Sequence, residues 1–359
     1  MPILSNILID ASDKGTYIIG TDLECFARVA VDADVSEAGR VTVPAKTMGD
    51  IVRVLPEDTI ELSTKGGQLT LKCNTNVYKL GTMGADDYPE WPETKADTTI
   101  EIKQSELNRL LSNTLFAIPS RDPRKVLMGA LIELKEGVLT CVATDGRKLG
   151  KARTKDIKVT GSKDIQCIIP GRVLAEIERT LNDEDDVKIE LSGQRSVFTL
   201  GNLGVTYLST LIEGKYPSYS SVIPDTFMKT IKLPKTILND AIGRAAILAE
   251  RKHHSIVLEF KDNKIEIESE SFEDGSYNGK LEIEYTDEPF KVAFNYHYLN
   301  DVFKVAPDVA INMKVKDSSS PIVFECASDA DTLYLVMPVR IHELRGSEEE
   351  SESRESVEV

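Results

Sequence analysis

The stretch TIEIKQSELNRLLSNTLFAI, residues 99–118, decides the fold because a second version of it, TIKLPKTILNDAIGRAAILA, occupies residues 230–249. Both versions open with alternating apolar residues, turn at a polar residue or a proline, and continue with apolar residues at helical spacing. Pairing Leu107 with Leu238 sets the offset at 131 residues (238 minus 107). That offset is the length of a domain rather than of a short solenoid repeat. The chain therefore reads as copies of one domain.

A second element, which ends a strand and starts a helix, occurs three times along the chain. Its copies begin at Val43, Ile169 and Phe294, at spacings of 126 and 125 residues. Thr-Asp steps at 21–22 and 144–145 also recur, and an Asx-type turn at a strand end explains them better than a metal or acid–base role. Each complete unit reads strand, helix, several strands, helix, several strands. The sequence therefore predicts an α+β fold with antiparallel sheets and two helices in each unit.

The repeats predict three similar domains, at residues 1–97, 98–226 and 227–345, followed by a tail at 346–359. The first domain is expected to be incomplete, because the repeat would place its opening strand roughly 24 residues before Met1. A misassigned start and a real truncation both fit this pattern. The tail, GSEEESESRESVEV, has six glutamates and one arginine, and we expect an acidic disordered segment there.

Length and composition bound the class of protein. The 359 residues are 41% hydrophobic and 28% charged, which is typical of a globular chain. No signal peptide is recognisable and no apolar run approaches the roughly 18 residues of a membrane span, so we expect a cytoplasmic protein. The five cysteines are scattered without a CxxC pair and are expected to be buried thiols. Neither a metal nor a cofactor is predicted.

Charge is unevenly distributed along the sequence. The net charge of −16 argues against an ordinary nucleic-acid binder, which would carry a basic patch. The five expected helices, at 45–54, 103–117, 171–181, 235–252 and 296–305, contain 11 basic and 7 acidic residues, a net charge of +4. A basic helical face suits a negatively charged partner held against the helices. Lysine and arginine are also good helix formers, so the positive charge of the expected helices does not by itself establish a negatively charged partner.

Motifs for enzyme chemistry are absent from the sequence. It contains no Walker A, GxGxxG, HExxH or GxSxG pattern. We therefore expect a non-enzymatic scaffold whose surface binds partners. A hydrolase that uses Asp145 or Asp22 is the rival interpretation.

Eight runs of sequence resemble the bacterial DNA polymerase III beta subunit family, the replicative sliding clamps. In the family's order they are PILSNILIDA (2–11), GTDLE (20–24), VPAKTMGDIVRVLP (43–56), FAIPSRDPRKVLMG (116–129), VATDGRKL (142–149), KYPSYSSVIP (215–224), RAAILAE (244–250) and YLVMPVRI (334–341). The resemblance implies three clamp domains per chain, with helices on the inner face and sheets outside, and two chains joined head to tail in a ring.

The function that this resemblance implies is that of a non-catalytic processivity factor. Such a ring encircles double-stranded DNA without reading its sequence, and the polymerase and exonuclease activities reside in its partners. No cofactor is implied. A truncated clamp paralogue that acts as a monomeric peptide-binding module is the alternative.

The resemblance also implies three sets of functional residues. A hydrophobic pocket between the second and third domains would take short peptides from DNA polymerase subunits, the clamp loader and repair or ligation proteins. Its matching positions are Leu127, Thr144, Gly146, Arg147, Lys148, Leu149, Pro217, Val222, Tyr298, Leu335, Met337, Pro338, Val339 and Arg340. The DNA-facing residues would be Arg124 and Lys125, then Arg172, and the dimer interface would join Tyr78 and Leu80 to Lys280 and Leu281.

One departure from the family concerns the predicted pocket. Arg147 and Lys148 stand where many members have histidine and arginine, and Ser221 stands where some members have arginine. We therefore expect the polarity of the pocket rim, and with it the ranking of partners, to differ in this chain.

Overall fold

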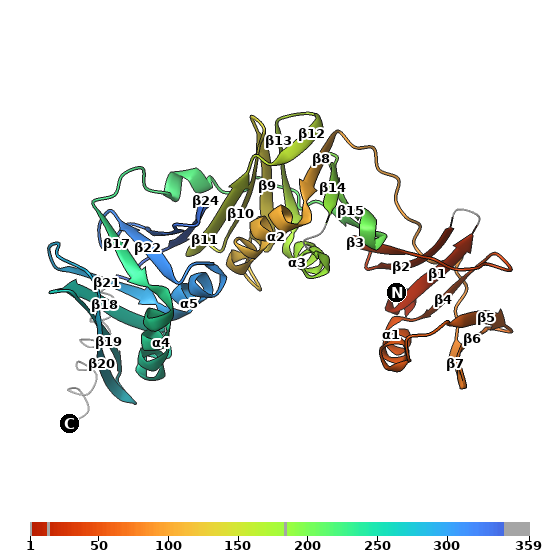
Figure 1. Ribbon diagram of the computed structural model, residues 1–359, viewed down its shortest axis with the longest axis horizontal. Coiled ribbons are helices and arrows are strands. Elements are labelled where there is room, and N and C mark those ends of the chain that lie inside the picture. The colour runs from red at the N-terminus through yellow and green to blue at the C-terminus, as the bar shows by residue number, and fades with distance from the viewer. Residues whose placement is uncertain (1, 13–14, 183–184, 341–359) are drawn as a thin grey trace, which may run out of the picture. The chain divides into compact units, whose positions relative to one another are not determined.

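The computed structural model describes residues 2–12, 15–182 and 185–340 (Figure 1). These residues form two compact units. Unit 1 contains residues up to Leu107, Asp156–Ile165 and Glu176–Leu211, and unit 2 contains Asn108–Lys155, Gln166–Ala175 and the residues from Ile212 onward. The second repeat therefore contributes to both units, and the domain boundaries expected from the repeats stay a prediction. The predicted disordered tail lies outside the described residues.

Unit 1 is built on two antiparallel sheets. Its strands are β1 (Asn6–Ser12), β2 (Gly15–Thr21), β3 (Cys25–Val31), β4 (Gly39–Pro44), β5 (Glu61–Lys65), β6 (Gln68–Cys73), β7 (Asn76–Gly81), β8 (Thr98–Lys103), β12 (Ile157–Gly161), β14 (Asp186–Leu191), β15 (Arg195–Leu200) and β16 (Val205–Thr210). Nine of them form one sheet, in the order β12-β8-β14-β15-β16-β3-β2-β1-β4, and β5-β6-β7 form the other. Because β16 pairs with β3, strands of the first and second repeats share the larger sheet.

Unit 2 repeats this plan with an eight-stranded and a four-stranded sheet. Its strands are β9 (Gly129–Lys135), β10 (Val138–Thr144), β11 (Lys148–Thr154), β13 (Ile165–Pro170), β17 (Lys229–Pro234), β18 (Ser255–Lys261), β19 (Lys264–Ser271), β20 (Gly275–Glu282), β21 (Phe290–Asn295), β22 (Ala310–Val315), β23 (Ile322–Cys326) and β24 (Asp329–Val336). The sheet orders are β13-β9-β10-β11-β24-β23-β22-β17 and β20-β19-β18-β21. Here β11 pairs with β24, which joins the second repeat to the third.

Each of the five described α-helices starts directly after a strand. They are α1 (Ala45–Val54), α2 (Gln104–Ser112), α3 (Gly171–Thr180), α4 (Lys235–Ala245) and α5 (Tyr296–Val305), with 3₁₀ turns η1 (Pro2–Ser5), η2 (Leu115–Ala117), η3 (Lys125–Met128), η4 (Gly201–Leu203), η5 (Tyr219–Val222) and η6 (Ala246–Leu248). The strand-to-helix steps predicted from the repeats are confirmed. No described helix has the length and apolar character needed to cross a bilayer.

Two helices are shorter than the sequence predicted. The segment 103–117 leaves the α-helix after Ser112, because the side chains of Asn113 and Thr114 donate to the carbonyls of Arg109 and Leu110, at 2.7 Å each. The segment 235–252 ends its helical turns at Leu248. The observed α-helices contain eight basic and six acidic residues, a net charge of +2. The net helix charge of +4 predicted from the sequence was therefore too high.

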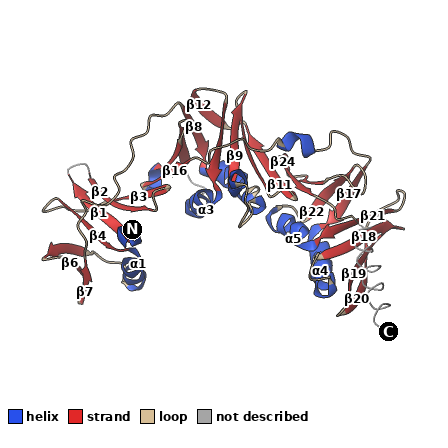
Figure 2. Ribbon diagram, turned by 180° about the vertical axis from the view of Figure 1, so that it is seen from behind, coloured by secondary structure: helices blue, strands red, loops and turns tan. Residues whose placement is uncertain are grey.

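The helices bury the apolar faces that their spacing predicted. In unit 2, Leu238, Ala241, Ile242 and Ala245 of α4 are all buried. Their cluster includes residues of α5 and of both sheets, and Figure 2 shows α4 and α5 beside these strands. Four of the five cysteines are buried as expected, and Cys25 is half-buried.

Candidate functional site

An apolar cluster in unit 2 gathers part of the predicted pocket. We call it the unit 2 cluster. Its buried members are Leu127, Leu131, Val142, Leu149, Ile168, Tyr216, Val323 and Leu335, and its half-buried members are Val126, Ile212, Tyr219, Ile223, Phe227, Leu333 and Met337. The half-buried residues form a rim that solvent reaches, so an apolar side chain of a partner would find apolar contacts there.

The pairing of β11 with β24 positions the centre of the unit 2 cluster. Leu149 lies opposite Leu335 in this ladder, and both are only 2% exposed. Met337 follows β24 directly, and its backbone N–H donates to the carbonyl of Arg147 at 2.8 Å. Leu127, from η3, is 1% exposed in the same cluster. The three leucines therefore form a floor, whereas Met337 is half-buried and open to a partner.

The turn between β10 and β11 borders the unit 2 cluster and is held by the second Thr-Asp step. Asp145 Oδ1 accepts from the backbone N–H groups of Arg147 and Lys148, at 2.8 Å each. Thr144 Oγ1 donates to the Lys148 carbonyl at 2.7 Å. The equivalent Asp22 accepts from the backbone in the same way. The Asx-type turns predicted for these steps are confirmed, and they give both aspartates a structural role.

Lys148 lies beneath the rim, contrary to the expectation that it changes rim polarity. It is 9% exposed, and its Nζ lies 2.5 Å from an Asp301 carboxylate oxygen on α5. The same Nζ lies 5.7 Å from the ring centre of Tyr298. Gly146, at φ +87, and Arg147 are the exposed residues of this turn. Of the two family departures here, only Arg147 presents its charge to solvent.

The other predicted pocket residues flank the unit 2 cluster along two chain segments. Pro217 and Val222 are exposed and lie on either side of Tyr219, a rim residue. Pro338, Val339 and Arg340 follow Met337 along the chain, and the Val339 N–H donates to the carbonyl of Ala293 at 2.8 Å. Arg340 is exposed.

Several rim residues were missed by the sequence reasoning. Tyr219 is anchored by its hydroxyl, which lies 2.8 Å from a Glu133 carboxylate oxygen, and by Lys151, 5.6 Å from its ring centre. Burial, aided by Glu133, raises the pKa of Tyr219 to about 12. Ile223 and Phe227 complete this side of the rim. The run KYPSYSSVIP contained Tyr219 and Ile223, and its aromatic and apolar residues after Pro217 were the available signal.

The three predicted DNA-facing cations lie in unit 2. Arg124 is exposed, but its guanidinium pairs with Asp122 at 2.8 Å and donates to the Asp145 carbonyl at 3.1 Å. This pairing lowers the pKa of Asp122 to about 2. Lys125 and Arg172 are exposed at the starts of η3 and α3.

The predicted dimer residues lie on two edge strands, β7 in unit 1 and β20 in unit 2. Leu80 is 8% exposed within the first repeat's own cluster, and Tyr78 packs against that cluster. Leu281 is half-buried against the third repeat's core, and Lys280 pairs with Glu266 at 2.8 Å. Lys280 is exposed whereas Leu80 is buried, so the open edge backbones and the Lys280 side chain are accessible for pairing with another chain.

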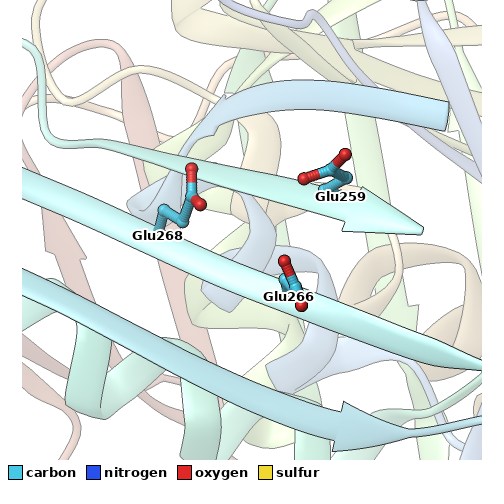
Figure 3. Close-up of side chains that lie close together, drawn as sticks. All are labelled: Glu259, Glu266 and Glu268. Atoms are coloured by element: carbon cyan, nitrogen blue, oxygen red, sulfur yellow. The ribbon is translucent and has the colours of Figure 1, made fainter. Parts of the chain in front are cut away.

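One acidic group could suggest a metal site. Figure 3 shows Glu266 and Glu268 on one strand and Glu259 on its neighbour, and one oxygen of each lies within 4.8 Å of the others. Lys261 lies 2.9 Å from Glu266 and 3.1 Å from Glu259, and Lys280 lies 2.8 Å from Glu266. Lys291 lies 3.3 Å from Glu268, so a lysine pairs with each of the three carboxylates, and the group is an ion-pair network on a sheet face.

Comparison with known sequence families covers most of the chain. Residues 1–92 match the DNA polymerase III beta subunit N-terminal domain, residues 101–218 match its central domain, and residues 220–340 match its C-terminal domain. The three matches follow the three repeats in order.

Individual relatives agree with this match along nearly the whole chain. The beta sliding clamp of Pseudomonas aeruginosa is 32% identical over 345 residues, covering 95% of this chain and 93% of the relative. A structure of the Pseudomonas aeruginosa sliding clamp bound to griselimycin has a TM-score of 0.89 at 31% identity, covering 95% of this chain and 92% of the other. The DNA polymerase III beta subunit of Thermotoga maritima has a TM-score of 0.88 at 27% identity, with coverages of 95% and 92%.

Proposed function

The chain belongs to the DNA polymerase III beta subunit family, and from this premise we propose how its surfaces carry out the work of a sliding clamp. The family function is that of a non-catalytic processivity factor in DNA replication. We propose that two chains close into a ring around duplex DNA in the cytoplasm. The ring tethers polymerase subunits, the clamp loader and repair or ligation proteins through short peptides.

The unit 2 cluster is the observation that carries the peptide-binding part of this proposal. Its floor is buried, and its rim offers Met337, Ile223 and Phe227 at partial exposure. Methionine adapts to side chains of different shapes, which suits a site that serves several partners. Arg147, exposed on the bordering turn, supplies a cation for acidic peptide residues. Relatives solved with griselimycin support a ligand site in this fold.

The proposed contact with DNA needs no strong or specific binding. Closure of a ring retains DNA by topology, so salt-screened contacts between exposed cations and phosphates are sufficient. The net helix charge of +2, within a chain of net charge −16, fits such weak contacts. Lys125 and Arg172 are the exposed cations proposed for this role, with Arg124 shared between Asp122 and the Asp145 carbonyl. Processivity then rises because a tethered polymerase rebinds at high effective concentration.

Replacement of the rim methionine tests the proposed peptide site. We expect Met337→Ala to weaken binding of a polymerase-derived clamp-binding peptide by about 1–2 kcal/mol, since a half-buried anchor contact is lost. Fluorescence anisotropy with a labelled peptide measures the change. The matched control is Met228→Ala, because Met228 is 82% exposed and is not a member of the unit 2 cluster. Equal affinity of Met337→Ala and the unchanged chain would refute the peptide site.

A further inference from the structure

Two histidine side chains from separate parts of the chain meet in unit 2. His254 lies in the turn before β18, and His297 lies in the first turn of α5. Their ring centres are 4.8 Å apart, and the rings meet at an angle of 73°. The two residues are 43 positions apart (297 minus 254), so sequence spacing alone does not reveal the contact. We call these two residues the histidine pair.

The pairing of β18 with β21 brings the histidine pair together. Ser255, which follows His254, lies opposite Asn295, which caps the start of α5. The backbone N–H of Tyr296 donates to the His254 carbonyl at 2.9 Å. The backbone N–H of His297 donates to Asn295 Oδ1 at 3.0 Å. Hydrogen bonds to the end of the sheet and to the helix start therefore position the backbones of both histidines.

The turn and a tyrosine ring also position the two imidazoles. His254 has a φ of +51, a left-handed conformation that residues other than glycine adopt uncommonly. Its N–H donates to the Glu250 carbonyl at 2.8 Å, which holds the turn in this form. The ring centre of Tyr296 lies 5.8 Å from that of His254 and 4.2 Å from that of His297. Backbone strain of this kind occurs often at binding sites, so the pair merits a functional explanation.

The separation of the two rings suits a shared metal ion. Zinc binds an imidazole nitrogen at about 2.0–2.1 Å, so two nitrogens on one ion lie no more than about 4 Å apart. The χ2 torsion of histidine has broad minima, and small rotations let one nitrogen of each ring reach the same ion. A free imidazole has a pKa of about 6.5 and is mostly neutral at pH 7.5, which is the form that binds metals.

The surroundings of the histidine pair leave it accessible to a cation. His297 is exposed and His254 is half-buried. Asp301 lies one helical turn after His297 on α5, and its carboxylate neutralises Lys148 at 2.5 Å. Lys304 lies seven residues after His297, about 10 Å along the helix axis. The neighbouring charges are therefore either paired or distant from the pair.

We propose that the histidine pair binds one Zn²⁺ ion through one imidazole nitrogen of each side chain, with water completing the coordination. The ion would tie the turn before β18 to the first turn of α5. Tyr298, the residue after His297, is a position of the predicted peptide pocket, so the zinc site adjoins that pocket. This site is separate from the acidic group on β18 and β19, whose carboxylates pair with lysines.

Calorimetric titration of the full chain with ZnCl₂ tests this proposal. Excess Mg²⁺ occupies surface carboxylates, because hard cations prefer oxygen ligands. We expect one site with a dissociation constant on the order of 10–100 µM, since two protein ligands hold zinc more weakly than the four of a structural site. His254→Ala and His297→Ala should each weaken binding at least about tenfold, because one of two protein ligands is lost. His253→Ala is the matched control and should leave the affinity unchanged.

Hydrogen exchange tests whether zinc bridges the two elements. Zinc should slow exchange of the His254 amide in the unchanged chain and in His253→Ala, but not in His297→Ala, where the link to α5 is missing. Circular dichroism checks that each variant stays folded. Absence of saturable zinc binding up to about 1 mM overturns the proposal. Zinc affinity that either alanine substitution in the pair leaves unchanged also overturns it.

Discussion

Single charged residues on the four-stranded sheet are held by specific partners. Glu266 in β19 accepts from Lys261 and Lys280, and these two ammonium groups lower its pKa to about 2. Lys261 ends β18 and Lys280 lies in β20, and these two strands pair with β19 on its two sides. This carboxyl group therefore stays ionised at pH values well below its ordinary pKa. The stability of the fold at acid pH is expected to depend on it.

We expect Glu266→Gln to lower the free energy of unfolding at neutral pH and to have progressively less effect as the pH falls. A carboxyl whose folded pKa is depressed stabilises the fold above its unfolded pKa, and this contribution disappears as the pH falls through the folded pKa. The window here runs from about 4.5 down to about 2. Urea unfolding at several pH values measures the difference. A difference as large at acid as at neutral pH would contradict the ion pairs, and Glu270→Gln on the same strand is the control.

At the scale of elements, α2 and β24 are tied together by side chains. Arg109 of α2 lies 2.9 Å from an Asp329 carboxylate oxygen and 3.1 Å from Thr332 Oγ1. Just after α2, the side-chain oxygen of Asn113 accepts from the hydroxyl of Tyr334. These bonds link the second repeat to the third within unit 2, next to the β11–β24 ladder.

Removal of the arginine tests this tie. We expect Arg109→Ala to destabilise the chain by about 1–3 kcal/mol, because it leaves Asp329 partly buried without its ion-pair partner. The side chains are 25% and 14% exposed, so the cost is below that of a fully buried pair. Arg179→Ala should cost less than about 0.5 kcal/mol, since its pair with Glu176 is mostly exposed. Thermal unfolding compares the two variants, and an equal loss of stability in both would contradict a stabilising role for the Arg109–Asp329 pair.

The sequence predicted the helices well because their signals are local. Leu238 and Ile242 follow helical spacing and are buried as predicted. The helix end at Ser112 was missed because it depends on which carbonyls the side chains of Asn113 and Thr114 take up. Apolar spacing continues through that point, so periodicity alone could not reveal the break.

The site was less predictable because its parts meet across long sequence distances. Family resemblance found Leu149 and Met337, but burial of Lys148 depends on Asp301, which lies 153 residues later. A lysine in the sequence looks exposed unless its partner is known. The pairing of β16 with β3 could not be predicted for the same reason. The alternation of apolar and polar residues along a strand does not reveal which strand lies beside it.

At the scale of the whole molecule, the proposed dimer depends on two open sheet edges. We expect Leu281→Ala to weaken the dimer on the order of tenfold, because Leu281 supports the edge strand β20. Sedimentation over a concentration series measures the dissociation constant. Val309→Ala, at a residue 80% exposed in the same repeat, is the matched control. An unaltered dissociation constant would rule out this interface.

Retention on circular DNA tests the central claim most directly. The chain is loaded by a clamp loader onto a nicked circular duplex, separated from free protein at elevated salt, and assayed before and after the circle is cut once. A ring held by topology stays on the circle and is lost on cutting, because it slides off the free ends. Equal retention on circular and linear DNA, or salt-sensitive loss from both, would contradict a closed ring and with it the proposed clamp mechanism.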